Sequence, residues 1–328
     1  MPIAEADPWR MQYFEGVVCP GDLIIPTEDG DAYMLFPKYR WLYNKLQIAE
    51  RQHIRCAPHG LEPDRYPVFS KPIYNMRGMG AGSQILGSRE EYLRGQLPGH
   101  MWMDLLEGEH VSTDAAIVDG RAHWWRHTVG LPIGRGMFDY WLVEAASRGS
   151  LEAHLGQWLD AHFRGYTGMI NLETIGGKII EGHLRFSDQW PDLYGADWVE
   201  SVVRLYRDGI WSFVDAGRRD GFSLVLFGPH GICYKHPSTA EVDELRTWPG
   251  IRSIQITFHE GRTAQSHSMP PGGFRLAIVN TSELVIGQAV RDRLARLFGL
   301  SPQFGRRAQS AQSTANLTPH RRAILTPG

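Results

Sequence analysis

The sequence predicts an α+β protein, and three observations carry this prediction. Strand-forming residues fill segments 168–175 and 178–186, and the two glycines at 176–177 between them are typical of a tight hairpin turn. Apolar residues at helical spacing precede this hairpin in segment 150–165. Helical and strand patterns mix again between residues 193 and 300, which predicts a small C-terminal α+β domain.

Further elements are expected upstream of that helix. Segment 66–73 has the composition of a strand and ends at the glycine-rich turn 77–83. Residues 101–118 alternate like two strands around "EGE", which predicts a β-hairpin flap. Ser150 is a candidate N-terminal cap for the helix 150–165.

The C-terminal part repeats the mixture of elements. The expected elements are a helix at 197–211, strands at 222–228, 253–259 and 274–280, and a helix at 282–298. The tail from Ser301 contains no acidic residue and little apolar periodicity, so we expect it to be disordered. The predicted domains are a short N-terminal region (1–40), a core (41–192), a closing domain (193–300) and the tail (301–328).

Composition excludes several classes of function. The chain has 328 residues, of which 42% are hydrophobic, and its formal net charge of -2 offers no basic surface field for nucleic acid. No apolar run approaches the roughly 20 residues that span a bilayer. A polar, acidic N-terminus and three scattered cysteines predict a cytoplasmic protein with free thiols, and the absence of CxxC and HExxH spacing argues against zinc.

The hairpin at 168–186 brings acidic residues together. Glu173 and Glu181 are nearly symmetric about the glycine turn, so their side chains can converge across the two strands. Two close carboxylates repel unless one is protonated or a cation lies between them, and their oxygens suit Mg²⁺. Glu181, His183 and Arg185 share one face of their strand. A solvent-exposed face of mixed charges remains the alternative at this point.

These residues resemble the metal-binding end of the ATP-grasp superfamily. The segment "EGHLR" at 181–185 is similar to the family signature E-x-N-x-R, with His183 in place of asparagine. The resemblance implies an ATP-grasp fold, in which two α+β subdomains clasp ATP. It also implies that Glu173, Glu181 and His183 bind Mg²⁺, with Mn²⁺ as the other candidate ion, and that Arg185 acts on the transferred phosphoryl group.

Upstream segments extend the resemblance to the phosphate-binding residues. The strand "VFSKP" and the glycine-rich segment after it resemble the family's phosphate lysine and flexible loop. Glycine lets backbone N–H groups approach phosphate oxygens closely. The residues implied are Lys71, Gly78, Gly80, Gly82 and Ser83. Lys45, in a helix that resembles the family's D-K-x-x helix with Asn44 in place of aspartate, is the other phosphate lysine or else an ordinary surface lysine.

The segment that follows resembles the hinge that holds adenine and ribose. The resemblance implies backbone contacts to adenine around Asp104 and Leu106, and ribose contacts from Glu109 or His110. His127, which follows an arginine, is a second candidate near the nucleotide. Each histidine has an equally ordinary interpretation as a packing residue.

The resemblance implies an ADP-forming carbon–nitrogen ligase that joins small-molecule carboxylate and amine substrates. The alternatives are phosphoryl transfer to bicarbonate or another acid, as in biotin-carboxylase-like members, and a non-catalytic nucleotide-binding module. The residues before Lys45 are too few for the domain that usually opens these enzymes. Its contribution is therefore missing, supplied by residues 17–33, or provided by a partner or a second copy in a homodimer. Neither nucleic acid nor a membrane is an expected partner.

Overall fold

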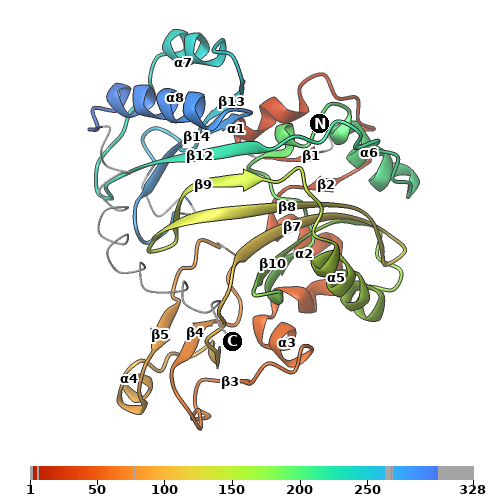
Figure 1. Ribbon diagram of the computed structural model, residues 1–328, viewed down its shortest axis with the longest axis vertical. Helices are drawn as coiled ribbons and strands as arrows, with labels where there is room; N and C mark the ends of the chain where they lie inside the picture. Colours follow the sequence, from red (N-terminus) through yellow and green to blue (C-terminus); the bar gives the residue numbers. More distant parts are fainter. Residues whose placement is uncertain (1–2, 6, 77, 263–266, 268, 302–328) are drawn as a thin grey trace, which may run out of the picture.

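The long antiparallel sheet is the centre of the protein (Figure 1). The computed structural model describes residues 3–5, 7–76, 78–262, 267 and 269–301. The strand order of the sheet is β11-β10-β7-β8-β9-β12-β14-β13. Its strands are β7 (His110–Val118), β8 (Arg121–Gly134), β9 (Met137–Val143), β10 (Gly168–Ile175), β11 (Lys178–His183), β12 (Gly221–Gly228), β13 (Ile251–Ile256) and β14 (Phe274–Thr281). The expected α+β class is confirmed.

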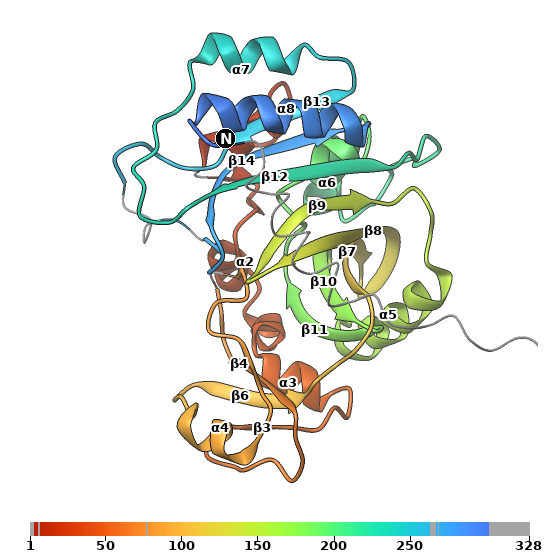
Figure 2. The ribbon, with the colours of Figure 1, turned by 60° about the vertical axis from the view of Figure 1, so that its left-hand side comes forward.

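A smaller sheet lies at one end of the molecule, with two C-terminal helices at the other end (Figure 2). The strand order of this smaller sheet is β3-β6-β4-β5. The strands are β3 (Cys56–Pro58), β4 (Val68–Pro72), β5 (Gln84–Leu86) and β6 (His100–Asp104), and α4 (Arg89–Arg94) follows β5. Helix α3 (Lys45–Glu50) contacts both β3 and β11, so it links the small sheet to the edge of the long one.

Helices cover both faces of the long sheet. Helix α5 (Gly149–His162) belongs to a core with Ala115 and Ile170, whereas α6 (Trp198–Asp208) belongs to a core with Ala116 and Met169. Since successive side chains of a strand point to opposite faces, α5 and α6 lie on opposite faces of the sheet. Helix α7 (Thr239–Arg246) packs on β13, and α8 (Leu284–Leu297) packs on β12 and β14. Among the described residues, no helix is both long and apolar enough to cross a membrane.

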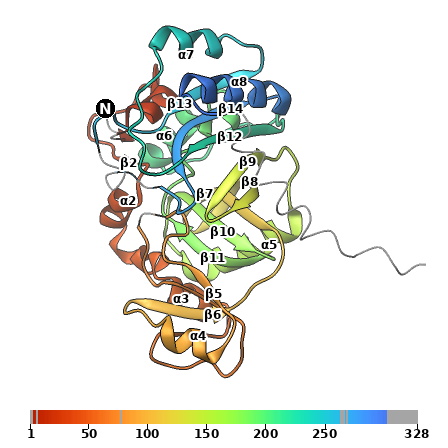
Figure 3. The ribbon, with the colours of Figure 1, turned by 90° about the vertical axis from the view of Figure 1, so that its left-hand side faces the viewer.

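The N-terminal residues run along one side of the molecule, from the C-terminal strands to α3 (Figure 3). Their elements are β1 (Ile3–Ala4), α1 (Pro8–Met11), η1 (Gln12–Phe14), β2 (Ile25–Pro26), α2 (Asp29–Leu35) and η2 (Pro37–Tyr43). Strands β1 and β2 pair in parallel, and α1 contacts β13. The Tyr13 hydroxyl donates to the Gln189 carbonyl at 3.0 Å, next to the turn η3 (Pro191–Leu193). This short region is therefore packed into the fold.

The hairpin β10–β11 forms as expected. Ile175 pairs with Lys178 across Gly176 and Gly177, whose φ values of 55° and 79° are the left-handed values that a two-residue hairpin turn requires. Gly176 is also needed for close packing, because a Cβ there would lie 2.3 Å from the Glu107 carbonyl oxygen. The turn is thereby held against the segment between β6 and β7.

Two local expectations are wrong, and one helix was not expected. Strands β6 and β7 belong to different sheets, so residues 101–118 form no β-hairpin flap. Ser150 does not cap α5, which begins at Gly149; its N-cap residue is Arg148 and makes no side-chain cap bond. Helix α7 was not expected, although Ser238 and Glu241 form a capping box at its start.

The C-terminal strands continue the long sheet. Strand β12 pairs with β9, with Phe222 opposite Leu142, so residues on both sides of the expected boundary at residue 192 share the long sheet. The physical reason is that β9 would otherwise present an open edge. The expected disordered tail lies outside the described residues from residue 302 onward.

Gly182→Ala is expected to destabilise the protein. An alanine Cβ at this position would lie 2.6 Å from Leu42 Cδ1 and 3.1 Å from Leu172 Cδ2, and both leucines are fully buried. Overpacking of this kind costs about 1–3 kcal/mol, which should lower the urea midpoint of unfolding. Gly149→Ala is the control, because a Cβ at Gly149 meets no atom within 4 Å. Equal midpoints for the two variants would contradict the prediction.

Candidate active site

A pocket of about 510 Å³ opens between the small sheet and the long sheet. Its walls come from β4, from β7, β10 and β11, from β12 and β14, and from the N-terminal residues. The expected site residues that line it are Lys45, Lys71, Gly78, Gly80, Ser83, His110, Glu173, Glu181, His183 and Arg185. Side chains from segments far apart in the sequence therefore meet in one cavity.

The two hairpin glutamates face each other as expected. Glu173 of β10 is the register partner of Glu181 of β11. Each carboxylate has a basic partner: His110 Nε2 lies 3.0 Å from Glu173 Oε2, and Lys45 Nζ lies 2.8 Å from Glu181 Oε1. Burial opposes a charge on Glu173, but the hydrogen bond and charge of His110, aided by His183 and Lys45, outweigh it and hold the pKa of Glu173 at about 2.

Two buried lysines lie beside these acids. The side chain of Lys45 projects from the first residue of α3, a helix that Asn44 caps by accepting a hydrogen bond from the Gln47 N–H at 3.1 Å. Lys71 Nζ, from β4, donates to the Ile180 carbonyl at 2.9 Å. Burial and the positive charge of Lys45 lower the pKa of Lys71 to about 8. Lys45 is therefore not a surface lysine, and both ammonium groups are available to an anion in the pocket.

The glycine-rich loop forms part of the pocket rim. Gly78, Met79, Gly80 and Gly82 all have φ between 60° and 75°, a run of left-handed backbone that glycine allows at little cost. Gly82 itself does not line the pocket, because it packs against Pro72. The N–H groups of Gly78, Ala81 and Ser83 donate to backbone carbonyls at 3.2–3.4 Å, so those of Met79, Gly80 and Gly82 are the candidates to meet phosphate oxygens.

An aspartate that the sequence did not reveal holds the end of the hairpin motif. Asp29, at the start of α2, is only 5% exposed and accepts from His183 Nδ1 at 3.0 Å. Arg185 contacts the same carboxylate through Nη2 at 3.0 Å and Nε at 2.9 Å. Burial opposes a charge on Asp29, but Arg185 and His183 outweigh it and hold its pKa well below the usual range. Asp29 thus fixes the positions of both basic side chains.

The residues of the pocket fit a magnesium ion whose remaining ligands are phosphate oxygens. Glu173 and Glu181 offer hard oxygen donors across the hairpin, and their side chains are 27% and 21% exposed. His183 does not join them in a preformed cluster. Among the described residues, the trio whose ligand atoms all lie within 4.8 Å of one another is Glu5, Asp7 and Glu28. Mg²⁺ usually keeps few protein ligands and takes the remainder from phosphate and water, which suits a two-carboxylate site.

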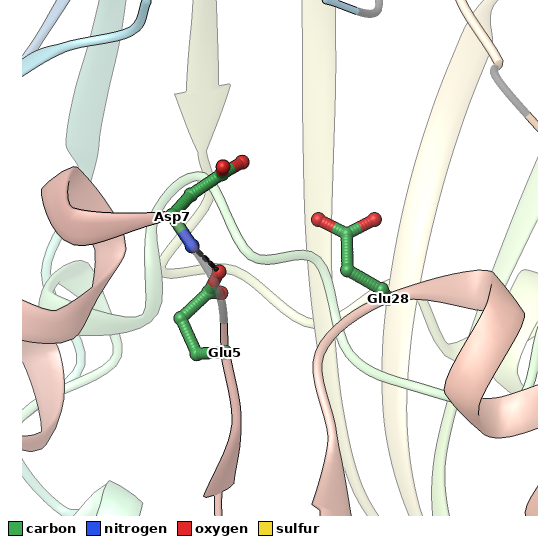
Figure 4. Close-up of side chains that lie close together, drawn as sticks. All are labelled: Glu5, Asp7 and Glu28. Atoms are coloured by element: carbon green, nitrogen blue, oxygen red, sulfur yellow. Dashed lines mark hydrogen bonds between the residues drawn. The ribbon is translucent and has the colours of Figure 1, made fainter. Parts of the chain in front are cut away.

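The trio Glu5, Asp7 and Glu28 is not a second metal site. Figure 4 shows the three carboxyl groups on the N-terminal segment, with the Asp7 N–H donating to Glu5. Arg10 Nη1 lies 3.6 Å from Glu5 Oε1 and 3.4 Å from Asp7 Oδ2, and it also pairs with Glu28. The guanidinium group therefore already supplies the positive charge that an ion would bring.

The remaining expected site residues do not line the pocket. Asp104 pairs with Arg55 at 2.6 Å, and the side chain of Leu106 packs in a small apolar cluster with Met101 and Met103. Glu109 pairs with Arg148 at 2.6 Å and is half exposed. His127 is fully buried between Thr113 and Glu152, each 3.0 Å away, which is the packing role that was its alternative interpretation.

The far wall of the pocket was not expected from the sequence. This wall combines charged, polar and apolar residues from the N-terminal segment, the segment after β11 and the C-terminal strands. They include Trp9, Arg10, Asp188, Trp190, Phe227, Thr257, His259, Met269 and Arg275. No short motif spans these segments, so only the fold brings them together.

Comparison with known proteins supports the architecture. No family model matches the chain, and no curated protein matches it by sequence. Among solved structures, an L-amino acid ligase from Bacillus licheniformis is similar, with 12% identity over 88% of this chain and 82% of that chain and a TM-score of 0.59. An N5-carboxyaminoimidazole ribonucleotide synthetase from Thermus thermophilus has 18% identity over 89% of this chain and 85% of that chain, with a TM-score of 0.54.

A phosphoribosylamine–glycine ligase from Thermotoga maritima is a third similar structure, with 14% identity over 87% of this chain and 85% of that chain and a TM-score of 0.55. The similarity covers more than four fifths of both chains in each case and confirms the expected ATP-grasp fold. At such low identities the similarity concerns the fold, and the chemistry has to be argued from the pocket.

Proposed function

We propose that this protein is an ATP-dependent ligase that activates a carboxylate as an acyl phosphate and joins it to an amine, releasing ADP and phosphate. The observation that carries the proposal is the meeting of two carboxylates, two buried lysines and one fixed arginine in a single pocket. This combination matches the needs of phosphoryl transfer, in which catalysis is mostly positioning and charge stabilisation.

Each group has a distinct role in the proposed reaction. Lys45 and Lys71 bind phosphate oxygens of ATP, and the loop at 78–83 covers them with backbone N–H groups. A magnesium ion held by Glu173 and Glu181 would neutralise charge on the β- and γ-phosphates. A substrate carboxylate oxygen attacks the γ-phosphorus and ADP departs. The amine then attacks the acyl carbon, phosphate leaves, and the amine's proton is released to solvent.

Arg185 stabilises the transferred group in both steps. Asp29 occupies one edge of its guanidinium group, which keeps the arginine directed along the pocket wall rather than free to rotate. A fixed cation placed where negative charge develops stabilises the transition state without reorganisation. The same arrangement would serve an acyl phosphate and the tetrahedral species that follows it.

Hydroxylamine trapping tests the proposal directly. The protein is incubated with ATP, Mg²⁺, hydroxylamine and a panel of carboxylates, and hydroxamate and ADP are measured. A hydroxamate that depends on both ATP and one carboxylate supports the ligase. ADP without hydroxamate, with a phosphorylated acid as the product, would favour the alternative phosphoryl-transfer reaction. ATP binding without turnover on any acid would favour a nucleotide-binding module.

ATP affinity is expected to fall as the pH rises through about 8. A bound phosphate stabilises the Lys71 ammonium and raises its pKa above the value in the free protein, so binding takes up a proton once Lys71 has begun to deprotonate. Affinity is therefore greatest below pH 8 and declines above it. Calorimetry across this range checks the prediction.

Lys71→Ala is the control for that pH dependence. Loss of a charge-assisted contact worth about 1.5–3 kcal/mol should weaken ATP binding at least tenfold at neutral pH. The variant should also lose the decline in affinity above pH 8. A variant that retained the same slope would show that another group titrates.

A further inference from the structure

Arg275 is a partly buried arginine of the pocket. It lies on β14, and no described residue forms an ion pair or a side-chain hydrogen bond with its guanidinium group, although its Nε atom is buried. Burial and the positive charge of Arg10 lower the pKa of Arg275 to about 10 against the opposing effect of Asp188, Asp7 and Glu28, so it remains protonated at neutral pH. A buried guanidinium nitrogen without a hydrogen-bond partner is costly, and such an atom calls for an explanation.

The other two partly buried arginines of the pocket are already neutralised. Arg10 is surrounded by carboxylates, among them Asp188 at 2.7 Å, and Arg185 is bound to Asp29. Arg262 also lines the pocket, but it is exposed, so water can hydrate its charge. Arg275 is therefore the partly buried pocket arginine that has no ion-pair partner among the described residues, and a ligand can supply one.

The surroundings of Arg275 restrict what that ligand can be. Phe227 is its register partner on β12 and lines the pocket on the same side of the sheet. Met269 lies beside the same strand position, since the Arg275 N–H donates to its sulfur at 3.1 Å. An anion at Arg275 thus lies next to apolar surface and near the negative charges of Asp188, Asp7 and Glu28, which favours a singly charged carboxylate on an apolar body over a highly charged phosphate.

We propose that Arg275 binds the carboxylate of a substrate whose adjoining part is apolar, such as an amino acid with an aliphatic or aromatic side chain. The planar fork of arginine matches the two oxygens of a carboxylate and can hold both. The proposal rests on the ligase function above, because it places a second organic substrate on the wall of the pocket away from the lysines. Arg275 would recognise the organic substrate, a role separate from that of the residues that bind ATP.

Binding without ATP separates this inference from the ligase proposal. The melting temperature of the full chain is measured with a panel of apolar amino acids and simple aromatic carboxylates, and again with their uncharged amides. Titration calorimetry then gives the dissociation constant of the best carboxylate for the wild-type protein, Arg275→Gln and Arg275→Lys. ATP affinity is measured on the same proteins. Arg262→Gln is the matched control, since it removes an exposed arginine from the same pocket.

We expect at least one carboxylate, and not its amide, to stabilise the wild-type protein. Arg275→Gln should weaken its binding at least about tenfold, and Arg275→Lys should weaken it less. ATP affinity should stay within about twofold, and Arg262→Gln should bind like the wild type. The inference is overturned if no carboxylate binds, if the amides bind equally well, or if Arg275→Gln leaves carboxylate binding intact. It is also overturned if that variant loses ATP and carboxylate binding alike.

Discussion

Glu181→Gln is expected to keep the fold and to reduce ATP-dependent turnover by several orders of magnitude. Glutamine has the shape of glutamate, and its amide oxygen can still accept from Lys45, whose Nζ lies 2.8 Å from Glu181 Oε1. It lacks the negative charge with which Glu181 and Glu173 would share a cation across the hairpin. The fold is therefore preserved while the metal-dependent step is lost.

Steady-state ADP release and the melting temperature together check this expectation. Glu50→Gln is the control, since Glu50 is an exposed residue of α3 that does not line the pocket. Titration of Mn²⁺ followed by electron paramagnetic resonance gives a readout independent of turnover, and the Glu181 variant should bind the ion more weakly. Unchanged turnover with increased stability would mean that the hairpin is only a charged surface.

Arg185→Lys is expected to have the second largest effect, and a different one. Lysine retains one positive charge but loses the planar group that contacts Asp29 through two nitrogens and leaves further N–H groups for substrate oxygens. Product formation should fall by about two orders of magnitude or more, because the lost interaction forms with the transition state. Nucleotide affinity should change little, because Lys45 and Lys71 remain.

Single-turnover kinetics and ATP calorimetry on the same preparation separate these effects. Asp29→Asn, which preserves the size of the side chain that holds Arg185, should lower the rate constant less than Arg185→Lys and also leave ATP affinity intact. If Arg185→Lys weakened ATP binding as much as it slowed product formation, Arg185 would be a ground-state nucleotide contact instead.

Local patterns in the sequence were sufficient for the centre of the site. The glycines at 176–177 fix the turn and hence the register, and the register makes Glu173 face Glu181. The prediction of Lys71 required only a strand followed by a glycine-rich loop, and the structure contains both elements. Such features are set within a few residues by turn geometry and strand alternation, so a single sequence can reveal them.

Only the tertiary structure decided the rest of the pocket. Asp29 reaches His183 across more than a hundred residues, and Arg275 joins the same cavity because β12 pairs with β9 and extends the long sheet. His127 is the opposite case. The local sequence resembled a nucleotide contact, but the strand directs its side chain toward Thr113 and Glu152. Partners of this kind depend on which strands become neighbours, a choice made by burial of apolar surface over the whole chain rather than by local residue spacing.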